Sequence, residues 1–134
     1  MTVYSKERFC LRRAGGLWCM IISATLFLLG VQPASAQSDA RRIYVDQGCA
    51  VCHGLMGHGG VGPDFVGDHF LIVGDYVAAQ ILLGRGQMPG FADKLSDDQI
   101  AAVASYIRQS WGNKLGDLSP DQVKQVRAKI QKPH

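Results

Sequence analysis

The stretch CAVCH, Cys49–His53, places two cysteines and a histidine on five consecutive residues. A disulfide between Cys49 and Cys52 would close a very short loop, and the stabilisation from a disulfide grows with loop length. A thioredoxin-like redox pair is expected within a βαβ pattern, which does not surround this stretch. Zinc needs four ligands, and the remaining histidines do not show the H-x₃₋₅-H spacing of a zinc finger. These three interpretations are therefore disfavoured.

The order C-x-x-C-H is instead typical of covalent haem attachment. One helical turn would bring both thiols to the same side, where they can add to the two vinyl groups of a haem. The adjacent imidazole would then lie under the iron. The sequence predicts one covalent haem c, with Cys49 and Cys52 as its thioether links and His53 as an axial iron ligand.

Two further stretches extend this pattern into a family resemblance. Together with CAVCH, the segments GRGQMPGF (84–91) and LSDDQIAAVASYIRQSWGN (95–113) resemble the class I c-type cytochromes. They are most similar to the small periplasmic cytochromes that serve dehydrogenases and oxidases. The resemblance implies an all-α cytochrome c fold, in which three core helices surround the covalently bound haem.

The resemblance also implies two more site residues. A haem bound by one histidine leaves the opposite iron position open, and Met88 lies in a loop marked by glycine and proline on both sides. Met88 is the expected second axial ligand, and His69 is the alternative. Met56 is too near His53 in the chain to reach the opposite face, so we expect it to be apolar filling beside the haem edge.

The proline of Gly62-Pro63-Asp64 corresponds to the family's Gly-Pro segment. In the family, this proline carbonyl accepts a hydrogen bond from the axial histidine, which sets the tautomer and strengthens the ligand. The same three residues are equally compatible with an ordinary turn made by glycine and proline. The resemblance thus implies that Pro63 is a cofactor-site residue.

Export is indicated by residues 1–36. Basic residues precede an apolar run over Leu17–Val31, and Ala34-Ser35-Ala36 is typical of a cleavage site. The run has about 15 residues, whereas a membrane-spanning helix needs roughly 20. We therefore expect a cleaved signal peptide, which would also remove Cys10 and Cys19, and a periplasmic protein. The membrane would be a partner only if the signal stayed uncleaved.

The remaining residues, 37–134, have the length of one small domain. The chain has a formal net charge of +3, but basic residues and aspartates are equally numerous after residue 36. The excess charge thus belongs to the signal segment. Nothing in residues 37–134 points to nucleic acid or to an anionic membrane surface as a partner.

The first helix is expected to begin at Ser38 or Asp39 and to run to about Gly48. In the family, a small residue lies where the first and last core helices cross. Arg41 occupies about that place here, so Ala40 or a shifted register must serve. The second helix is predicted over Tyr76–Leu83, capped by Asp75.

The third helix has the clearest sequence signals. Ser96-Asp97-Asp98-Gln99 forms a capping box with acids in the first turn. One helical face then carries Ile100, Val103, Ala104, Ile107 and Trp111.

A cytochrome c domain is thus expected over residues 37–118. Ser119-Pro120-Asp121-Gln122 opens an extra C-terminal helix, so residues 119–134 are a helical extension. Its narrow apolar stripe is expected either to fold back on the domain or to dock on a partner subunit.

An iron with histidine and methionine ligands has no free position for a substrate. We therefore expect a one-electron carrier rather than an enzyme, working between a periplasmic dehydrogenase and a cytochrome or oxidase acceptor. Two alternatives remain open. One is a haem-based sensor or gas-binding protein with a displaceable sixth ligand, and the other is a fixed electron-transfer subunit of an oxidoreductase complex.

Overall fold

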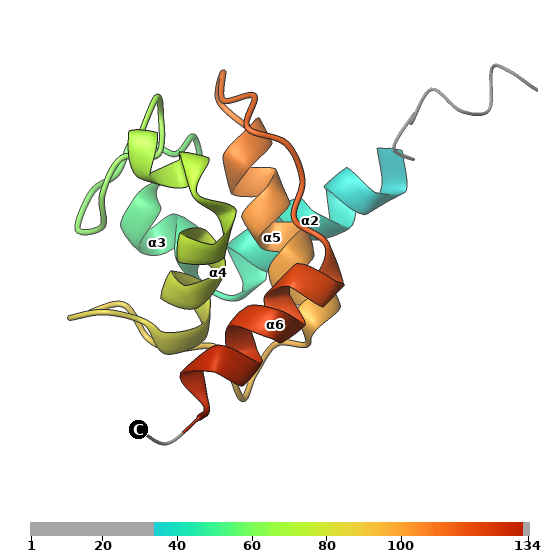
Figure 1. Ribbon diagram of the computed structural model, residues 1–134. Helices are drawn as coiled ribbons and strands as arrows, with labels where there is room; N and C mark the ends of the chain where they lie inside the picture. Colours follow the sequence, from blue (N-terminus) through green and yellow to red (C-terminus); the bar gives the residue numbers. More distant parts are fainter. Residues whose placement is uncertain (1–33, 133–134) are drawn as a thin grey trace, which may run out of the picture. The chain divides into compact units, whose positions relative to one another are not determined.

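The computed structural model describes residues 34–132, and side chains from residue 37 onward. Its elements are α2 (Ala34–Asp46), α3 (Cys49–His53), the 3₁₀ helix η2 (His69–Ile72), α4 (Gly74–Leu83), α5 (Asp97–Gln109) and α6 (Pro120–Ile130) (Figure 1). No strand occurs among these residues, and the predicted all-α fold is confirmed. None of the helices in this part of the chain has the length and apolarity needed to cross a membrane. The predicted signal peptide lies almost wholly outside the described residues.

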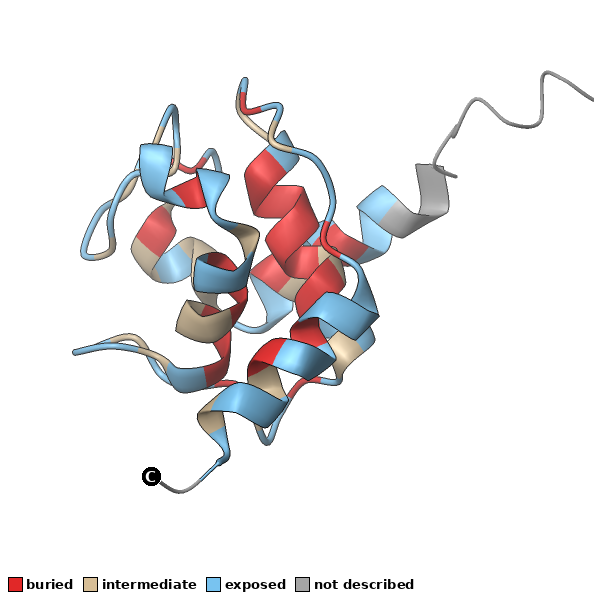
Figure 2. Ribbon diagram, in the orientation of Figure 1, coloured by how far each residue is buried: buried red, intermediate tan, exposed pale blue. Residues whose placement is uncertain are grey.

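Helix α5 is the centre of the core, with α2, α4 and α6 packed around it (Figures 1 and 2). It begins as predicted, because the Ser96 hydroxyl accepts a hydrogen bond from the Gln99 amide and the Gln99 side chain accepts one from the Ser96 amide. The predicted face is buried at Ile100, Val103, Ala104 and Ile107.

Trp111 does not extend that helical face, because α5 ends at Gln109. The Trp111 backbone is left-handed, with φ 56°. Its ring packs against Tyr44 and Tyr106, with centroids 5.5 and 5.4 Å away. The prediction of an i+11 helical position is therefore wrong, although Trp111 does join the core.

Helix α2 packs on α5 through a small residue. Ala40 is 4% exposed, while Arg41 points to solvent. Ala40 thus allows α2 to approach α5 closely. Of the two options stated from the sequence, Ala40 or a shifted register, the structure shows the first. The helix begins at Ala34 rather than at Ser38, and it ends at Asp46 because the chain turns into a left-handed conformation at Gly48 (φ 78°).

Helix α4 starts earlier than predicted, at Gly74. Val73 occupies the N-cap position and makes no side-chain capping bond, and Asp75 lies in the first turn. The prediction of Asp75 as the cap is wrong. Its carboxylate still favours the helix, because the first turn carries partial positive charge.

The C-terminal helix α6 folds back on α4 and α5. Pro120 is at the first helical position, as predicted, and a capping box pairs Ser119 with Gln122. Val123 and Val126 are buried at 0% and 5% exposure. The apolar stripe of the extension is thus used within the domain itself.

Candidate cofactor site

The two cysteines and the histidine lie on α3, a single short helix between two left-handed glycines. Gly48 (φ 78°) precedes Cys49, and Gly54 (φ 77°) follows His53. Cys49 and Cys52 are half-buried and form no disulfide with each other, whereas His53 is 6% exposed. Burial, with a smaller effect of the neighbouring Cys52, raises the pKa of the Cys49 thiol. The protonated thiol is therefore favoured at neutral pH.

The ring of His53 is held from three directions. Its Nδ1 lies 3.0 Å from the carbonyl oxygen of Pro63. Because a carbonyl only accepts, Nδ1 carries the proton and Nε2 keeps its lone pair in the neutral imidazole. The Phe65 ring stacks on the imidazole, with centroids 4.3 Å apart and planes 15° apart. A Cβ atom on Gly62 would stand 2.7 Å from the nearest ring atom, so only glycine fits there.

Asn113 ties the Phe65 segment to the end of α5. Its buried amide donates to the Phe65 carbonyl (2.8 Å) and to the Ile107 carbonyl (3.3 Å), and it accepts from the Gly67 amide (3.1 Å). Sequence analysis identified neither Phe65 nor Asn113. The position of Phe65 just after the Gly-Pro segment was a weak indication that it lies near His53. No sequence pattern indicated the role of Asn113.

Met88 lies in a tight turn that we call the Met88 loop, residues 84–90. The Arg85 amide donates to the Met88 carbonyl (3.1 Å), and the Met88 amide donates to the Arg85 carbonyl (3.0 Å). Gly84 has φ 69°, and a Cβ atom there would stand 2.2 Å from the Met88 carbonyl oxygen. The loop can close in this form only with glycine at position 84.

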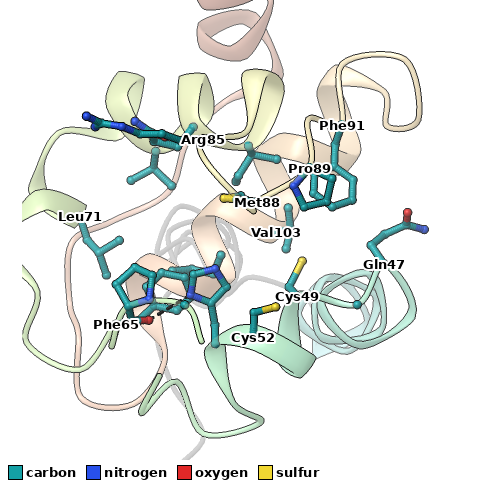
Figure 3. A pocket seen from close by; sticks show the side chains of 18 of the residues that line it. Gln47, Cys49, Cys52, Phe65, Leu71, Arg85, Met88, Pro89, Phe91 and Val103 are labelled. Atoms are coloured by element: carbon teal, nitrogen blue, oxygen red, sulfur yellow. Dashed lines mark hydrogen bonds between the residues drawn. The ribbon is translucent and has the colours of Figure 1, made fainter. Parts of the chain in front are cut away.

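A cavity of about 640 Å³ lies between α3, η2, α4, α5 and the Met88 loop. In Figure 3, Cys49 and Cys52 lie on one side of it and Met88 on the other. Most of the wall is apolar, formed by side chains such as Leu71, Val77, Ile81, Val103 and Ile107. The structure brings all the predicted site residues to this one cavity: Cys49, Cys52, His53, Pro63 and Met88.

Two residues considered in the sequence lie elsewhere. His69 does not line the cavity, and 78% of its side chain is exposed. Met56 is 63% exposed and also lies outside the cavity lining, so the expectation that it packs at the cofactor edge is not met. Met88 is consequently the methionine at the cavity.

Arg108 supports one wall of the cavity from behind. Its buried guanidinium donates to four backbone carbonyls, those of Leu71, Ile72, Leu115 and Gly116. Burial lowers the pKa of this side chain, but a guanidinium stays charged in proteins. The four bonds join η2, whose Leu71 side chain lines the cavity, to the loop that follows α5.

These donors fit a covalent haem. Two thiols, a neutral imidazole nitrogen and a soft thioether sulfur face a largely apolar cavity, which suits a flat apolar macrocycle with a central iron. Within residues 37–132, no three side chains of the His, Cys, Asp or Glu type are grouped so as to bind a free metal ion.

Comparison with known proteins supports this interpretation of the site. Residues 35–107 match the family described as cytochrome c oxidase, cbb3-type, subunit III. A cytochrome c-552 of Thermus thermophilus is 33% identical over 127 residues, covering 77% of this chain and 84% of that protein.

Other relatives are matched over smaller parts of their length. A chloroplastic cytochrome c6 of Chlamydomonas reinhardtii is 33% identical over 96 residues, and this chain spans 64% of its length. A fructose dehydrogenase cytochrome subunit of Gluconobacter japonicus is 36% identical over 99 residues, but this chain spans only 20% of it.

Proposed function

Since this chain belongs to the cytochrome c family, and is thus an electron-transfer protein with covalent haem c, we propose a ligand set for that haem. Cys49 and Cys52 form the thioether links, and His53 and Met88 are the axial iron ligands. Pro63 orients His53. The observation that carries this proposal is that all five residues, from three separate segments, line one apolar cavity.

Each residue has a distinct chemical role. The two thiols of α3 attach the macrocycle, so the cofactor cannot be lost by dilution. The Pro63 carbonyl accepts a hydrogen bond from Nδ1 of His53, which would leave Nε2 free to ligate and make the imidazole a stronger ligand. The Met88 thioether favours the reduced metal and raises the reduction potential.

When bound, the haem supplies an iron that takes up and releases one electron. The apolar side chains of α4 and α5 exclude water and favour the less charged, reduced centre. With both axial positions filled, no position is left for a substrate, so we propose that this chain acts by electron transfer alone.

We further propose the compartment and the partners. The pattern of residues 1–36 favours export to the periplasm. Relatives that are cytochrome subunits of alcohol and fructose dehydrogenases favour a dehydrogenase as the electron donor. A cytochrome or an oxidase would then be the acceptor. Periplasmic recovery after cell fractionation, with the mature mass measured by mass spectrometry, tests the export step.

The ligand set is tested by optical spectra of the oxidised and reduced protein, for wild type and Met88→Ala. A c-type spectrum whose thioether–iron charge-transfer band disappears in the variant supports ligation by His53 and Met88. An unchanged band assigns the sixth ligand to another residue. Ready binding of carbon monoxide by the reduced wild type would favour a gas-binding protein instead.

A further inference from the structure

Arg127 on α6 makes a three-part contact with the chain that follows the Met88 loop. Its Nε donates to an Asp97 carboxylate oxygen (2.7 Å), one Nη to the Ala92 carbonyl (2.6 Å) and the other Nη to the Leu95 carbonyl (3.0 Å). Only 18% of the Arg127 side chain is exposed. Hydrogen bonds from a charged, partly desolvated donor are among the stronger ones in proteins.

The segment held by Arg127 continues directly from the Met88 loop. The amide of Phe91 donates to the Ile81 carbonyl (3.0 Å), and the amide of Ala92 donates to the Leu82 carbonyl (3.1 Å). Ala92 is thus held on both sides, by α4 through its amide and by α6 through its carbonyl. The Met88 loop therefore starts and ends at points that α4 and α6 hold in place.

The Arg127 contact is connected to the cavity wall through residues that α6 holds from outside. No residue of α6 lines the cavity, but the Leu95 side chain does, and the Leu95 carbonyl accepts from Arg127. Phe91, also in the lining, is 5% exposed. A loop with both ends held has few alternative conformations, and releasing one end lengthens the segment that is free to move.

We infer that the C-terminal extension is the outer anchor of the Met88 loop, and that Arg127 is a positioning residue for the sixth ligand. The inference rests on the proposed ligation of the haem iron by Met88. Without the Arg127 contact, the chain after the Met88 loop is no longer bonded to α6 and keeps only its backbone bonds to α4, so the open state of the loop becomes more populated. A competing ligand then binds with higher apparent affinity, because that affinity scales with the fraction of open molecules.

The test is a titration of the oxidised holoprotein with imidazole, followed by loss of the thioether–iron charge-transfer band. We compare wild type with Arg127→Ala, which removes all three hydrogen bonds. Arg127→Lys retains the charge and the aliphatic stem but not the forked geometry. It serves as the second variant if Arg127→Ala does not accumulate as holoprotein.

The matched control is Lys129→Ala. Lys129 also lies on α6 and also reaches another helix, through an ion pair with Asp75 of α4 at 3.7 Å. Both partners of that pair are more than half exposed, and the pair joins α6 to α4 rather than to residues 91–97. The control thus removes an α6 contact of similar charge without releasing the Met88 loop.

We expect Arg127→Ala to raise the apparent imidazole affinity by about tenfold, Arg127→Lys to raise it less, and Lys129→Ala to leave it within about twofold of wild type. Denaturant unfolding is measured in parallel. An Arg127→Ala protein that unfolds more easily but binds imidazole as wild type does has lost only structural support, and this result overturns the inference. Equal increases in Arg127→Ala and Lys129→Ala also overturn it.

The ligation of the iron by Met88 and the anchoring role of Arg127 can be distinguished by experiment. A charge-transfer band that Met88→Ala abolishes, together with unchanged imidazole affinity in Arg127→Ala, overturns the anchoring role alone. A wild-type protein without a Met88-dependent band overturns the ligation by Met88 and the anchoring role together.

Discussion

The two sides of the cavity are built in different ways. On one side, a single five-residue helix, α3, carries both cysteines and His53. On the other side, Met88 is brought in by a loop whose shape depends on Gly84, on α4 and on α6. The first side is specified by residues adjacent in the sequence, and the second by contacts between segments far apart.

The difference predicts which side is more sensitive to changes at a distance. Attachment through α3 needs only one helical turn and its two flanking glycines. Placement of Met88 needs the whole helical cage. Substitutions remote from the cavity should therefore loosen methionine ligation before they affect covalent attachment.

The largest expected effect comes from Gly84→Ala. Its Cβ atom would stand 2.2 Å from the Met88 carbonyl oxygen, so the loop cannot close as it does in the wild type. We expect the thioether–iron charge-transfer band to be lost while covalent haem remains. The optical spectrum measures the first and a haem stain of the denatured protein the second.

Gly86→Ala is the matched control for that change. Gly86 has φ 61°, close to the 69° of Gly84, but a Cβ atom on it meets nothing within 4 Å. Both variants place a Cβ atom at positive φ, but Gly84 also has ψ 177°, a combination essentially restricted to glycine, and only its Cβ atom meets the Met88 carbonyl. Loss of the band in both variants would show that strain, and not the close approach to Met88, is the cause.

Removing residues after Leu118 is the next largest change. Deleting α6 exposes the surface that covers Val123 and Val126, two of its buried side chains. Each buried aliphatic side chain contributes about 1.5–3 kcal/mol, so we expect the free energy of unfolding to fall by about 3–6 kcal/mol. Covalent haem should persist, because no proposed ligand lies in the extension. A truncated protein without covalent haem would contradict the separation between the two sides.

Gly62→Ala probes the histidine side. Its Cβ atom would stand 2.7 Å from the His53 ring, which cannot retreat easily because Phe65 stacks on it. Such overpacking costs about 1–3 kcal/mol, and the displaced imidazole should alter the reduction potential and the haem spectrum. Gly67→Ala carries the strain of a side chain at φ 69°, but its Cβ atom meets nothing within 4 Å, so it should leave the spectrum unchanged. A wild-type spectrum for Gly62→Ala would mean that the ring has room to move.

Tyr44→Phe should have the smallest effect. The Tyr44 hydroxyl donates to the Gly54 carbonyl (2.8 Å) at the end of α3, and the ring is fully buried. Loss of this hydrogen bond should lower the free energy of unfolding by about 0.5–1.5 kcal/mol. Haem attachment should be unchanged, as denaturant unfolding and a haem stain will show.

The same residue predicts a pH dependence. Burial raises the pKa of Tyr44 above its usual value. Above about pH 10, the unfolded chain releases this proton while the folded chain retains it, so folded stability falls as the pH rises. Wild type should lose stability in this range more steeply than Tyr44→Phe. If the free energy of unfolding falls equally steeply with pH in both proteins, Tyr44 is not the group that causes the pH dependence.

Local signals predicted much of the fold. The capping box at Ser96 and the proline after Ser119 place the starts of α5 and α6 correctly, because each signal is complete within the first turn of its helix. The same kind of reasoning failed at Asp75, where an acid in the first turn looks like a cap. It also failed at Trp111, because the helical spacing of apolar residues continues in the sequence beyond the residue at which the helix ends.

Long-range polar contacts were not predictable in this way. Asn113 and Arg127 hold the two sides of the cavity by bonding to residues as far as 48 and 35 positions away in the sequence. Their partners are mostly backbone carbonyls. Every residue has one of these, so no amino-acid pattern marks which carbonyl will be the acceptor.

The sequence by itself determined the class of cofactor, because the attachment motif is complete within one turn of helix and needs no other part of the chain. It also determined an all-α fold, through the family resemblance, and the starts of α5 and α6, through local signals at the first turn of each helix. The tertiary structure alone decided that Phe65 stacks on the His53 ring and that Arg127 bonds to the chain after the Met88 loop. The physical reason is that these features depend on backbone groups and close approaches, which exist only once distant segments have packed together.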